Sequence, residues 1–260
     1  MRIVSHTCSN TEIVCALGCA EMLVGVDQDS DFPVDVVSQL PKLGRDLSLD
    51  IEQVRALKPD LVLTSRTLPG HETIVEQLQA CGLPTLICEP VSMDEVYEDI
   101  RRIANALQVQ ERGEALIAQM QAEMPTIAPH ADAPKILIEW WPKPVIAPTR
   151  DSWASDLIEM AGASNPWRSL PGKSVPLSSE QIHQHAPDVV VMAWCGVSVE
   201  NYRSDIVRRR EGWDSVPAVK HNRIYPITEA FLGRPGPRLV DGYKALRSLV
   251  ETYQGGQRPS

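Results

Sequence analysis

The chain is short of positive charge: 25 lysines and arginines stand against 34 aspartates and glutamates, giving a formal net charge of −9. A nucleic-acid surface needs clustered basic side chains to neutralise phosphates. The only basic run, Arg208 to Arg210, is followed at once by Glu211, and we interpret it as the solvated end of a helix. The composition therefore argues against nucleic acid as a partner.

Long apolar runs are also missing. No segment approaches the roughly 18 to 20 apolar residues that a membrane-spanning helix needs. The N-terminus lacks the basic, apolar and small-residue zones of a signal peptide, and Met1-Arg2 leads directly into an expected strand. As written, the sequence predicts a cytoplasmic, globular protein, and we expect a monomer that does not span a membrane. A periplasmic or other extracytoplasmic location is the alternative if a leader has been removed from the chain.

Several enzyme signatures are absent as well. The chain contains no H-E-x-x-H, G-x-S-x-G, P-loop or G-x-G-x-x-G pattern, which argues against a hydrolase, a kinase or a dinucleotide enzyme. Its six cysteines include no C-x-x-C pair, which argues against zinc ribbons and thioredoxin chemistry. Cys15, Cys19 and Cys81 stand beside aliphatic residues at helical positions, so we expect them to be small core residues.

One pattern occurs twice. Residues 51–63 read IEQVRALKPDLVL, and residues 179–191, displaced by 128 positions, read SEQIHQHAPDVVV. In each copy Glu-Gln and an aliphatic residue begin a short helix, Pro-Asp ends it, and an aliphatic run follows as a buried strand. Because this spacing far exceeds a solenoid repeat, the pattern predicts two similar α/β lobes with a ligand cleft between them.

Strand and helix patterns alternate in both halves, which predicts mostly parallel sheets in a Rossmann-like arrangement. We expect an N-terminal lobe over residues 1–91, a bridging helical segment over 92–124 and a C-terminal lobe over 125–260. About 30 helical residues would extend roughly 45 Å, enough to join two lobes as one rigid helix. The segment has a weak point between Val109 and Gly113, so two ordinary helices folded back within one lobe are the alternative.

Ligands of open α/β sheets gather beyond the carboxyl ends of the strands. The segments expected at those ends carry Arg66, Glu89, Glu229 and three of the six tryptophans: Trp140, Trp141 and Trp194. A flat, rigid indole beside solvent is suited to covering a large planar ligand. The alternative is that Trp140 and Trp194 pack between lobe and loop.

The first expected helix begins near Ser9, which forms a predicted capping box with Glu12. Cys8 precedes this helix, where the unpaired amides and the helix dipole favour an anionic thiolate. Cys8 could therefore be a soft metal ligand or a nucleophile, and a buried or merely exposed thiol is the alternative. His6 has a similar position.

The chain resembles the vitamin B12 and iron-chelate binding proteins of ABC importers, and in particular their BtuF-like cobalamin-binding branch. The resemblance covers nearly the whole chain and is carried by RIVS at residues 2–5, SNTEI at 9–13, LVGV at 23–26, DFP at 31–33, LKPDLV at 57–62, NRIY at 222–225 and RPGPRL at 234–239. It implies two α/β lobes joined by a rigid helical backbone, a ligand held between them, limited hinge closure and no catalysis. Family members dock on a permease through one glutamate on each lobe, and Glu72 matches the first. Gly233 stands where the second is expected, with Glu229 nearby as a substitute.

With this resemblance the sequence predicts a non-enzymatic protein that binds cobalamin or a related corrinoid, for uptake through an ABC permease or for intracellular corrinoid handling. We expect Trp140, Trp141 and Trp194 to cover the macrocycle, with hydrogen bonds from polar groups nearby. The full set of expected ligand-binding residues is Cys8, Ser9, Asn10, Asp31, Phe32, Arg66, Trp140, Trp141, Trp194, Glu229 and Phe231. An iron-siderophore or haem ligand is the alternative within the same fold.

Two further alternatives stay open. One is a direct transition-metal carrier that uses His6, His71, Glu72 and Glu229 as ligands. The other is an enzyme that depends on Cys8.

Overall fold

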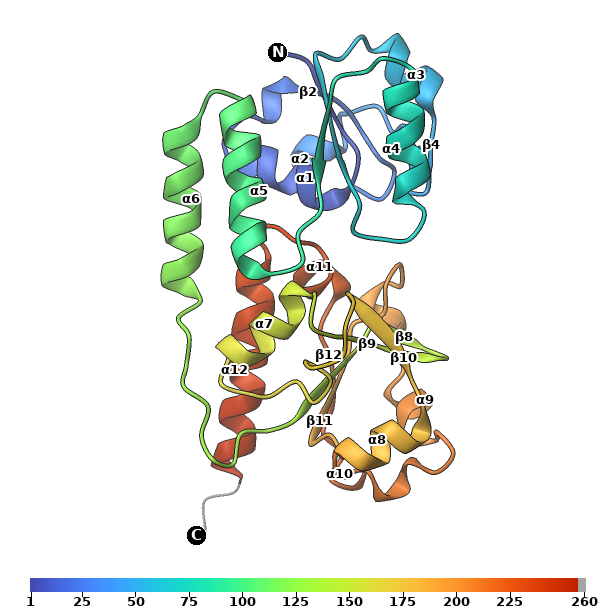
Figure 1. Ribbon diagram of the computed structural model, residues 1–260, viewed down its shortest axis with the longest axis vertical. Helices are drawn as coiled ribbons and strands as arrows, with labels where there is room; N and C mark the ends of the chain where they lie inside the picture. The colour runs from blue at the N-terminus through green and yellow to red at the C-terminus, as the bar shows by residue number, and fades with distance from the viewer. Residues whose placement is uncertain (257–260) are drawn as a thin grey trace. The chain divides into compact units, whose positions relative to one another are not determined.

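The computed structural model describes residues 1–256, which form an α/β fold divided into two compact units (Figure 1). Unit 1 comprises Met1–Pro90 and Asp94–Met120, and unit 2 comprises Val91–Met93 and the chain from Gln121 onward. No helix among the described residues is both long and apolar enough to cross a bilayer.

Unit 1 is built on a parallel four-stranded sheet in the order β2-β1-β5-β6. The strands are β1 (Ile3–Ser5), β2 (Leu23–Val26), β5 (Leu61–Ser65) and β6 (Thr85–Cys88), and a small antiparallel ribbon joins β3 (Gly44–Arg45) to β4 (Ser48–Leu49). The helices are α1 (Cys8–Ala16), α2 (Val34–Val37), α3 (Ile51–Ala56), α4 (His71–Ala80), α5 (Met93–Ala106) and α6 (Gln110–Glu123), with a 3-10 turn at Ala20–Met22. The expected parallel α/β alternation is confirmed here.

Unit 2 contains a second parallel sheet, in the order β12-β11-β7, from β7 (Ile136–Glu139), β11 (Val189–Met192) and β12 (Ile224–Pro226). It also has an antiparallel sheet that the sequence did not lead us to expect, made of β8 (Trp141–Pro142), β9 (Val145–Pro148) and β10 (Ser174–Leu177). Helices α7 (Trp153–Met160), α8 (Ser179–His185), α9 (Ser204–Arg208), α10 (Pro217–Lys220), α11 (Glu229–Leu232) and α12 (Leu239–Gly255) complete it, with 3-10 turns at Val199–Asn201 and Trp213–Ser215. Unit 2 therefore departs from the element order of unit 1.

The repeated pattern performs the same structural task in both units. After α3, the carboxylate of Asp60 accepts a hydrogen bond from the Arg2 amide at 2.6 Å, and the Asp60 amide donates to the Arg2 carbonyl at 2.8 Å. After α8, the carboxylate of Asp188 accepts from the Lys135 amide at 3.0 Å, and the Asp188 amide donates to the Lys135 carbonyl at 2.8 Å. The aspartate thus holds the residue before β1 in unit 1 and the residue before β7 in unit 2. These bonds set the register between that strand and the strand that follows the aspartate.

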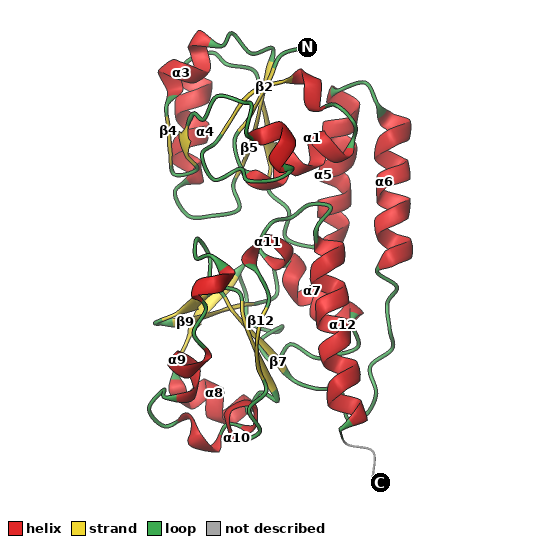
Figure 2. Ribbon diagram, turned by 180° about the vertical axis from the view of Figure 1, so that it is seen from behind, coloured by secondary structure: helices red, strands yellow, loops and turns green. Residues whose placement is uncertain are grey.

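The helical segment between the expected lobes is not one continuous rod. Helices α5 and α6 each have 14 residues and lie side by side (Figure 2). A Cβ placed on Gly113 would lie 2.6 Å from the Ala104 Cβ, and Arg101 donates to Glu114 at 2.8 Å. The chain turns back between α5 and α6, and Gly113 allows the two helices to pack this closely. The prediction of a single rigid helix is therefore wrong in this respect, and the alternative of two packed helices is confirmed.

Two local predictions are also wrong. Helix α1 begins at Cys8, with Thr7 rather than Ser9 before its first turn, and Thr7 makes no side-chain cap, so the predicted Ser9–Glu12 capping box does not form. Of the three cysteines expected in the core only Cys19 is buried, while Cys15 is half-buried and Cys81 is exposed. Cys81 follows the last residue of α4, beyond the helix face that packs on the sheet.

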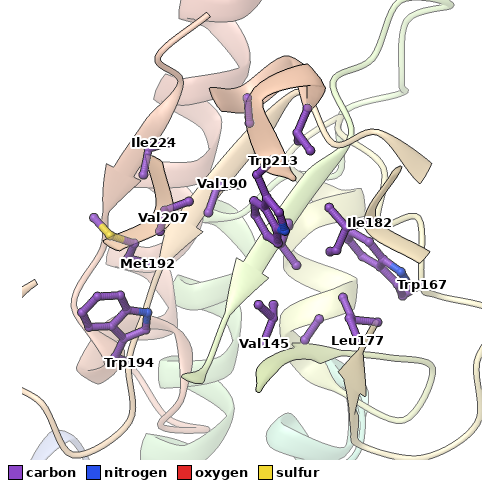
Figure 3. Close-up of a cluster of buried hydrophobic side chains, with 14 residues drawn as sticks. Val145, Trp167, Leu177, Ile182, Val190, Met192, Trp194, Val207, Trp213 and Ile224 are labelled. Atoms are coloured by element: carbon purple, nitrogen blue, oxygen red, sulfur yellow. The ribbon is translucent and has the colours of Figure 1, made fainter. Parts of the chain in front are cut away.

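Unit 2 holds a core rich in tryptophan. Trp167, Trp194 and Trp213 pack with aliphatic side chains from both of its sheets and from α8 and α9 (Figure 3). Unit 1 has an aliphatic core without tryptophan, in which Val4 and Val62 of the parallel sheet meet Ile74 and Leu78 of α4. All six tryptophans of the chain lie in unit 2, so intrinsic tryptophan fluorescence reports on that unit alone.

Candidate functional site

In unit 1 a buried carboxylate organises the loops at the carboxyl ends of β1 and β2. Asp27 has no exposed surface and accepts hydrogen bonds from the amides of Thr7 (3.1 Å), Asp29 (2.8 Å) and Ser30 (3.0 Å), as well as from the Ser30 hydroxyl (2.6 Å). Burial raises the pKa of Asp27 above its usual value. Thr7 has a φ of +101°, an uncommon conformation for a β-branched residue, and its bond to Asp27 helps to hold it there. Asp27 therefore positions the entry to α1.

The first three predicted ligand residues lie at that entry. The Cys8 thiol is half-buried and donates to the Asp29 carbonyl at 3.0 Å. Ser9 and Asn10 are buried, at 6% and 1% exposure, and the Asn10 amide donates to the His6 carbonyl at 3.3 Å. Ser9 and Asn10 thus support the loop from inside, and Cys8 is the member of the three with accessible surface.

His6 and His71, which the metal-carrier alternative places in one site, form a buried pair. Their rings meet edge to face at 5.4 Å, and both side chains are at most 1% exposed. Nδ1 of His6 lies 2.7 Å from the Thr64 hydroxyl and Nε2 lies 2.6 Å from the Asp46 carbonyl oxygen, while Nε2 of His71 lies 3.7 Å from the Asp46 carboxylate. Burial lowers the pKa of His6 to about 4.

In this structure both ring nitrogens of His6 therefore lie within hydrogen-bond distance of oxygen atoms of other residues. Through Asp46, His71 and His6 hold the loop between β3 and β4. Among residues 1–256 no group of three or more histidine, cysteine, aspartate or glutamate side chains has the arrangement of a metal site.

Arg66 lines a cavity of about 320 Å³ at the carboxyl ends of β5 and β6. Its other walls are Ile87, Glu89 and Pro90 and one face of α5, formed by Glu95, Glu98, Asp99 and Arg102. Asp99 is 6% exposed and accepts from Arg102 at 2.7 Å, and burial raises its pKa to about 6. The remaining predicted residues of unit 1, Asp31 and Phe32, follow β2 and are exposed.

In unit 2 the three tryptophans expected at the strand ends have different environments. Trp141 opens β8 and is 42% exposed, and Trp140 is half-buried. Trp194 is only 3% exposed and belongs to the core (Figure 3). Its ring lies 5.3 Å from that of Tyr202. In this structure the Trp194 ring therefore presents no exposed face and packs inside unit 2.

Behind these tryptophans lies a buried ion pair. Glu139, the last residue of β7, is fully buried and accepts two hydrogen bonds of 2.8 Å from the guanidinium of Arg210, plus one of 2.9 Å from the Trp194 indole. Arg210 also lies over the ring of Trp213 at 4.4 Å. Arg210 is thus not part of a solvated helix end as the sequence suggested, although Arg209 beside it is, with 83% of its side chain exposed.

Glu229 and Phe231 follow β12. Glu229 is half-buried, with a carboxylate oxygen 3.5 Å from Nε of Arg234, and Phe231 lies below the guanidinium of Arg238 at 5.7 Å. A Cβ placed on Gly233 would come within 2.5 Å of the Glu229 carboxylate, so Glu229 occupies the space that a side chain at position 233 would need. In unit 1, Glu72 is exposed in the first turn of α4 and accepts from the Gly70 amide at 2.9 Å.

Parallel pairing brings these groups to one edge of the sheet within each unit. In unit 1 the segments after β1, β2, β5 and β6 lie at the same edge of the sheet. In unit 2 the segments after β7, β11 and β12 lie at the same edge, and the Cys195 amide after β11 donates to the Trp140 carbonyl after β7 at 3.0 Å. Each edge offers accessible polar groups, and that of unit 2 adds an exposed indole. Such an arrangement defines a solute-binding protein of the two-unit α/β class.

The comparisons agree with this class. A family model described as periplasmic binding protein matches residues 3–230, so the chain belongs to the periplasmic binding protein family. It is 30% identical over 258 residues to the uncharacterized ABC transporter substrate-binding lipoprotein YvrC of Bacillus subtilis, covering 96% of this chain and 79% of that protein. It is 22% identical to the vitamin B12-binding protein of Vibrio parahaemolyticus, covering 99% of this chain and 90% of that protein. Among solved structures it is similar to the apo form of the periplasmic heme-binding protein RhuT of Roseiflexus sp. RS-1, with a TM-score of 0.79, 29% identity and coverage of 96% of this chain and 98% of that one.

Sequence reasoning missed the residues that position the site: Asp27, Asp46, Glu139 and Arg210. Each acts through a partner distant in sequence, as Glu139 does with Arg210, 71 residues away. The one available signal was the position of Glu139 at the end of an otherwise apolar strand, since a carboxylate there must find a partner if it is buried.

Proposed function

We propose that the protein binds a tetrapyrrole-type ligand, a corrinoid such as cobalamin in the first place, and delivers it to an ABC importer without a catalytic step. The observation that carries this proposal is the exposed indole of Trp141 at the carboxyl edge of the parallel sheet in unit 2. A flat aromatic surface beside half-buried Trp140 suits a large planar macrocycle with an apolar face.

The predicted ligand residues with accessible polar side chains are Cys8, Asp31 and Arg66 in unit 1 and Glu229 in unit 2, and these would meet polar substituents. The accessible rings of Phe32 and Phe231 would meet apolar parts of the ligand. We do not assign Trp194 to the ligand, because its indole is in the core and donates to Glu139. Ser9 and Asn10 would act by holding the loop that carries Cys8.

Haem is the second candidate. The chain is more similar in sequence to the heme-binding protein RhuT, at 29% identity, than to the vitamin B12-binding protein of Vibrio parahaemolyticus, at 22%. Haem carries two propionate groups, and Arg66 is a cation that could bind one of them.

The test is a parallel fluorescence titration with cyanocobalamin and with haemin. Covering the exposed part of an indole removes roughly 60 to 100 Å² of surface, worth about 2 kcal/mol. Trp141→Ala should therefore raise the Kd of the true ligand about 30-fold. Ile206→Ala is the matched control, since Ile206 is 45% exposed in the same unit and belongs to α9.

Binding of cyanocobalamin but not haemin would support the first candidate, and the reverse pattern would support the second. If neither ligand binds at micromolar protein, or if Trp141→Ala and Ile206→Ala behave alike, the proposal is wrong.

For the importer partner we propose that Glu72 contacts a permease, because it is exposed at the start of α4. The names of the relatives, a substrate-binding lipoprotein and periplasmic binding proteins, favour an extracytoplasmic location over the cytoplasmic one. In a reconstituted importer Glu72→Ala should reduce transport while leaving ligand affinity unchanged, whereas unchanged transport would remove Glu72 from the interface.

A further inference from the structure

A continuous chain of hydrogen bonds runs through unit 2 from the β8 hairpin to the first turn of α11. Arg210 donates to the Pro142 carbonyl at 3.1 Å and, through both terminal nitrogens, to Glu139 at 2.8 Å. Glu139 accepts from the Trp194 indole at 2.9 Å, and the Trp194 carbonyl accepts from the Tyr202 hydroxyl at 3.1 Å. We name this chain the polar spine; it consists of Arg210, Glu139, Trp194, Tyr202 and the amide of Glu229.

The last link reaches a predicted ligand residue. The Glu229 amide donates to the Tyr202 hydroxyl oxygen at 3.3 Å, so this hydroxyl is both donor and acceptor. Burial raises the pKa of Tyr202 to about 12, which keeps the proton needed for the donated bond. The Tyr202 ring also lies against the Trp194 ring at 5.3 Å.

The two ends of the spine are the two segments of unit 2 that carry accessible candidate ligand groups. At one end Arg210 fixes Pro142, which pairs with Val145 in the β8–β9 hairpin and directly follows Trp141. At the other end Tyr202 fixes the amide at the start of α11, which carries Glu229 and Phe231. The two segments can be coupled without a direct side-chain bond between them. The buried charges of Arg210 and Glu139 make the hydrogen bonds of the spine costly to break.

We propose that the polar spine couples the Trp141 segment to the Glu229 segment, so that Arg210, Glu139 and Tyr202 are positioning residues for ligand binding. This role rests on the proposed function, whereas the coupling itself is a property of unit 2 and can be measured without a ligand. A rigid pair of segments loses less conformational freedom on binding, and this is the source of the expected effect on affinity.

The decisive measurement is amide hydrogen exchange at Glu229. Tyr202→Phe removes the acceptor and should speed exchange of the Glu229 amide about tenfold or more. Arg210→Met should also speed this exchange, because Arg210 is linked to the Glu229 amide through Glu139, Trp194 and Tyr202. It should add little in a Tyr202→Phe background, because the chain of hydrogen bonds is already cut there. Where Arg210→Met does not fold, Glu139→Gln replaces it in the same cycle.

Tyr243→Phe is the matched control. Its hydroxyl donates to the Pro125 carbonyl in the same unit, so the variant loses a comparable hydrogen bond outside the spine. Exchange at Glu229 should stay unchanged in this variant. If Arg210→Met and Glu139→Gln leave the exchange at Glu229 as it is in the unaltered protein, the segments are not coupled and the inference is overturned.

Affinity for the ligand found by titration supplies the second readout. Tyr202→Phe should raise its Kd about three- to tenfold, while Tyr243→Phe should leave it within about twofold. If the variants show coupled amide exchange but neither cyanocobalamin nor haemin binds, the proposed function and the positioning role are refuted. The coupling between the two segments would then still stand. Ligand binding that Tyr202→Phe does not weaken would refute the positioning role alone.

Discussion

The buried ion pair of unit 2 allows a stability effect to be worked out from the structure. Glu139 has no exposed surface, and Arg210 supplies two of the three side-chain hydrogen bonds that its carboxylate receives. Removing one partner of a buried pair costs about 3 to 5 kcal/mol, because the other charge is left uncompensated. Losing the guanidinium over Trp213 adds roughly 0.5 to 1 kcal/mol. Arg210→Met should therefore destabilise unit 2 by about 4 kcal/mol while its hydrocarbon stem still fills the space.

The assay is urea unfolding followed by tryptophan fluorescence, which reports on unit 2 alone. With a slope of about 1 to 3 kcal/mol per molar urea, the midpoint should fall by more than ~1 M. Glu139→Gln in addition should recover a large part of the loss, because the neutral amide oxygen still accepts from the Trp194 indole and no buried charge remains. Arg209→Met is the control and should leave the midpoint unchanged, since this side chain is 83% exposed. Equal midpoints for Arg210→Met and Arg209→Met would refute the reasoning.

Three further outcomes are expected. His6 stays neutral in the folded protein because its pKa is lowered to about 4. The free energy of unfolding should therefore fall by up to ~3 kcal/mol as the pH drops from about 6.5 to about 4. In His6→Gln, unfolding followed by circular dichroism should show a weaker dependence of this free energy on pH, and an unchanged dependence would contradict the role of His6. Asp27→Asn should destabilise unit 1 and speed exchange of the Thr7 amide, because an amide group accepts at one atom only, and unaltered exchange there would count against the role of Asp27. Gly242→Ala should lower the unfolding midpoint, since a Cβ would lie 2.1 Å from the Phe231 carbonyl oxygen, whereas Gly255→Ala at an open position of the same helix should not; equal midpoints would rule out the clash.

The elements that could be predicted are those whose signal is local. Strand β6 has such a signal, because Pro84 precedes it, Glu89-Pro90 follows it and a short aliphatic run lies between. The repeated Pro-Asp pattern correctly predicts the end of a helix and the start of a buried strand in both units. What could not be read from it is the reason for the aspartate, namely its bonds to residues more than 50 positions away.

Elements without a local signal were missed. The β8–β9 hairpin contains Pro142 and Pro148 in its short strands and Pro144 in its turn, so it shows no apolar alternation. Its existence depends on pairing with β10, about 30 residues later in the chain. The direction of α6 likewise depends on Gly113 meeting Ala104, a contact that periodicity does not reveal.

The candidate site divides in the same way. Positions after strands could be predicted, because parallel strands end at a common edge, but side-chain direction could not. Trp141 and Trp194 look equivalent in sequence, yet one is 42% exposed and the other 3%. Arg210 and Arg209 are neighbours with opposite environments, and the difference arises from Glu139, which lies on another element.

The absorption spectrum of the protein purified from its native organism tests the proposed function most directly. We predict bound ligand in about stoichiometric amount, with corrin bands if the first candidate is correct and a haem Soret band if the second is. A colourless preparation that also takes up neither cyanocobalamin nor haemin would contradict the account.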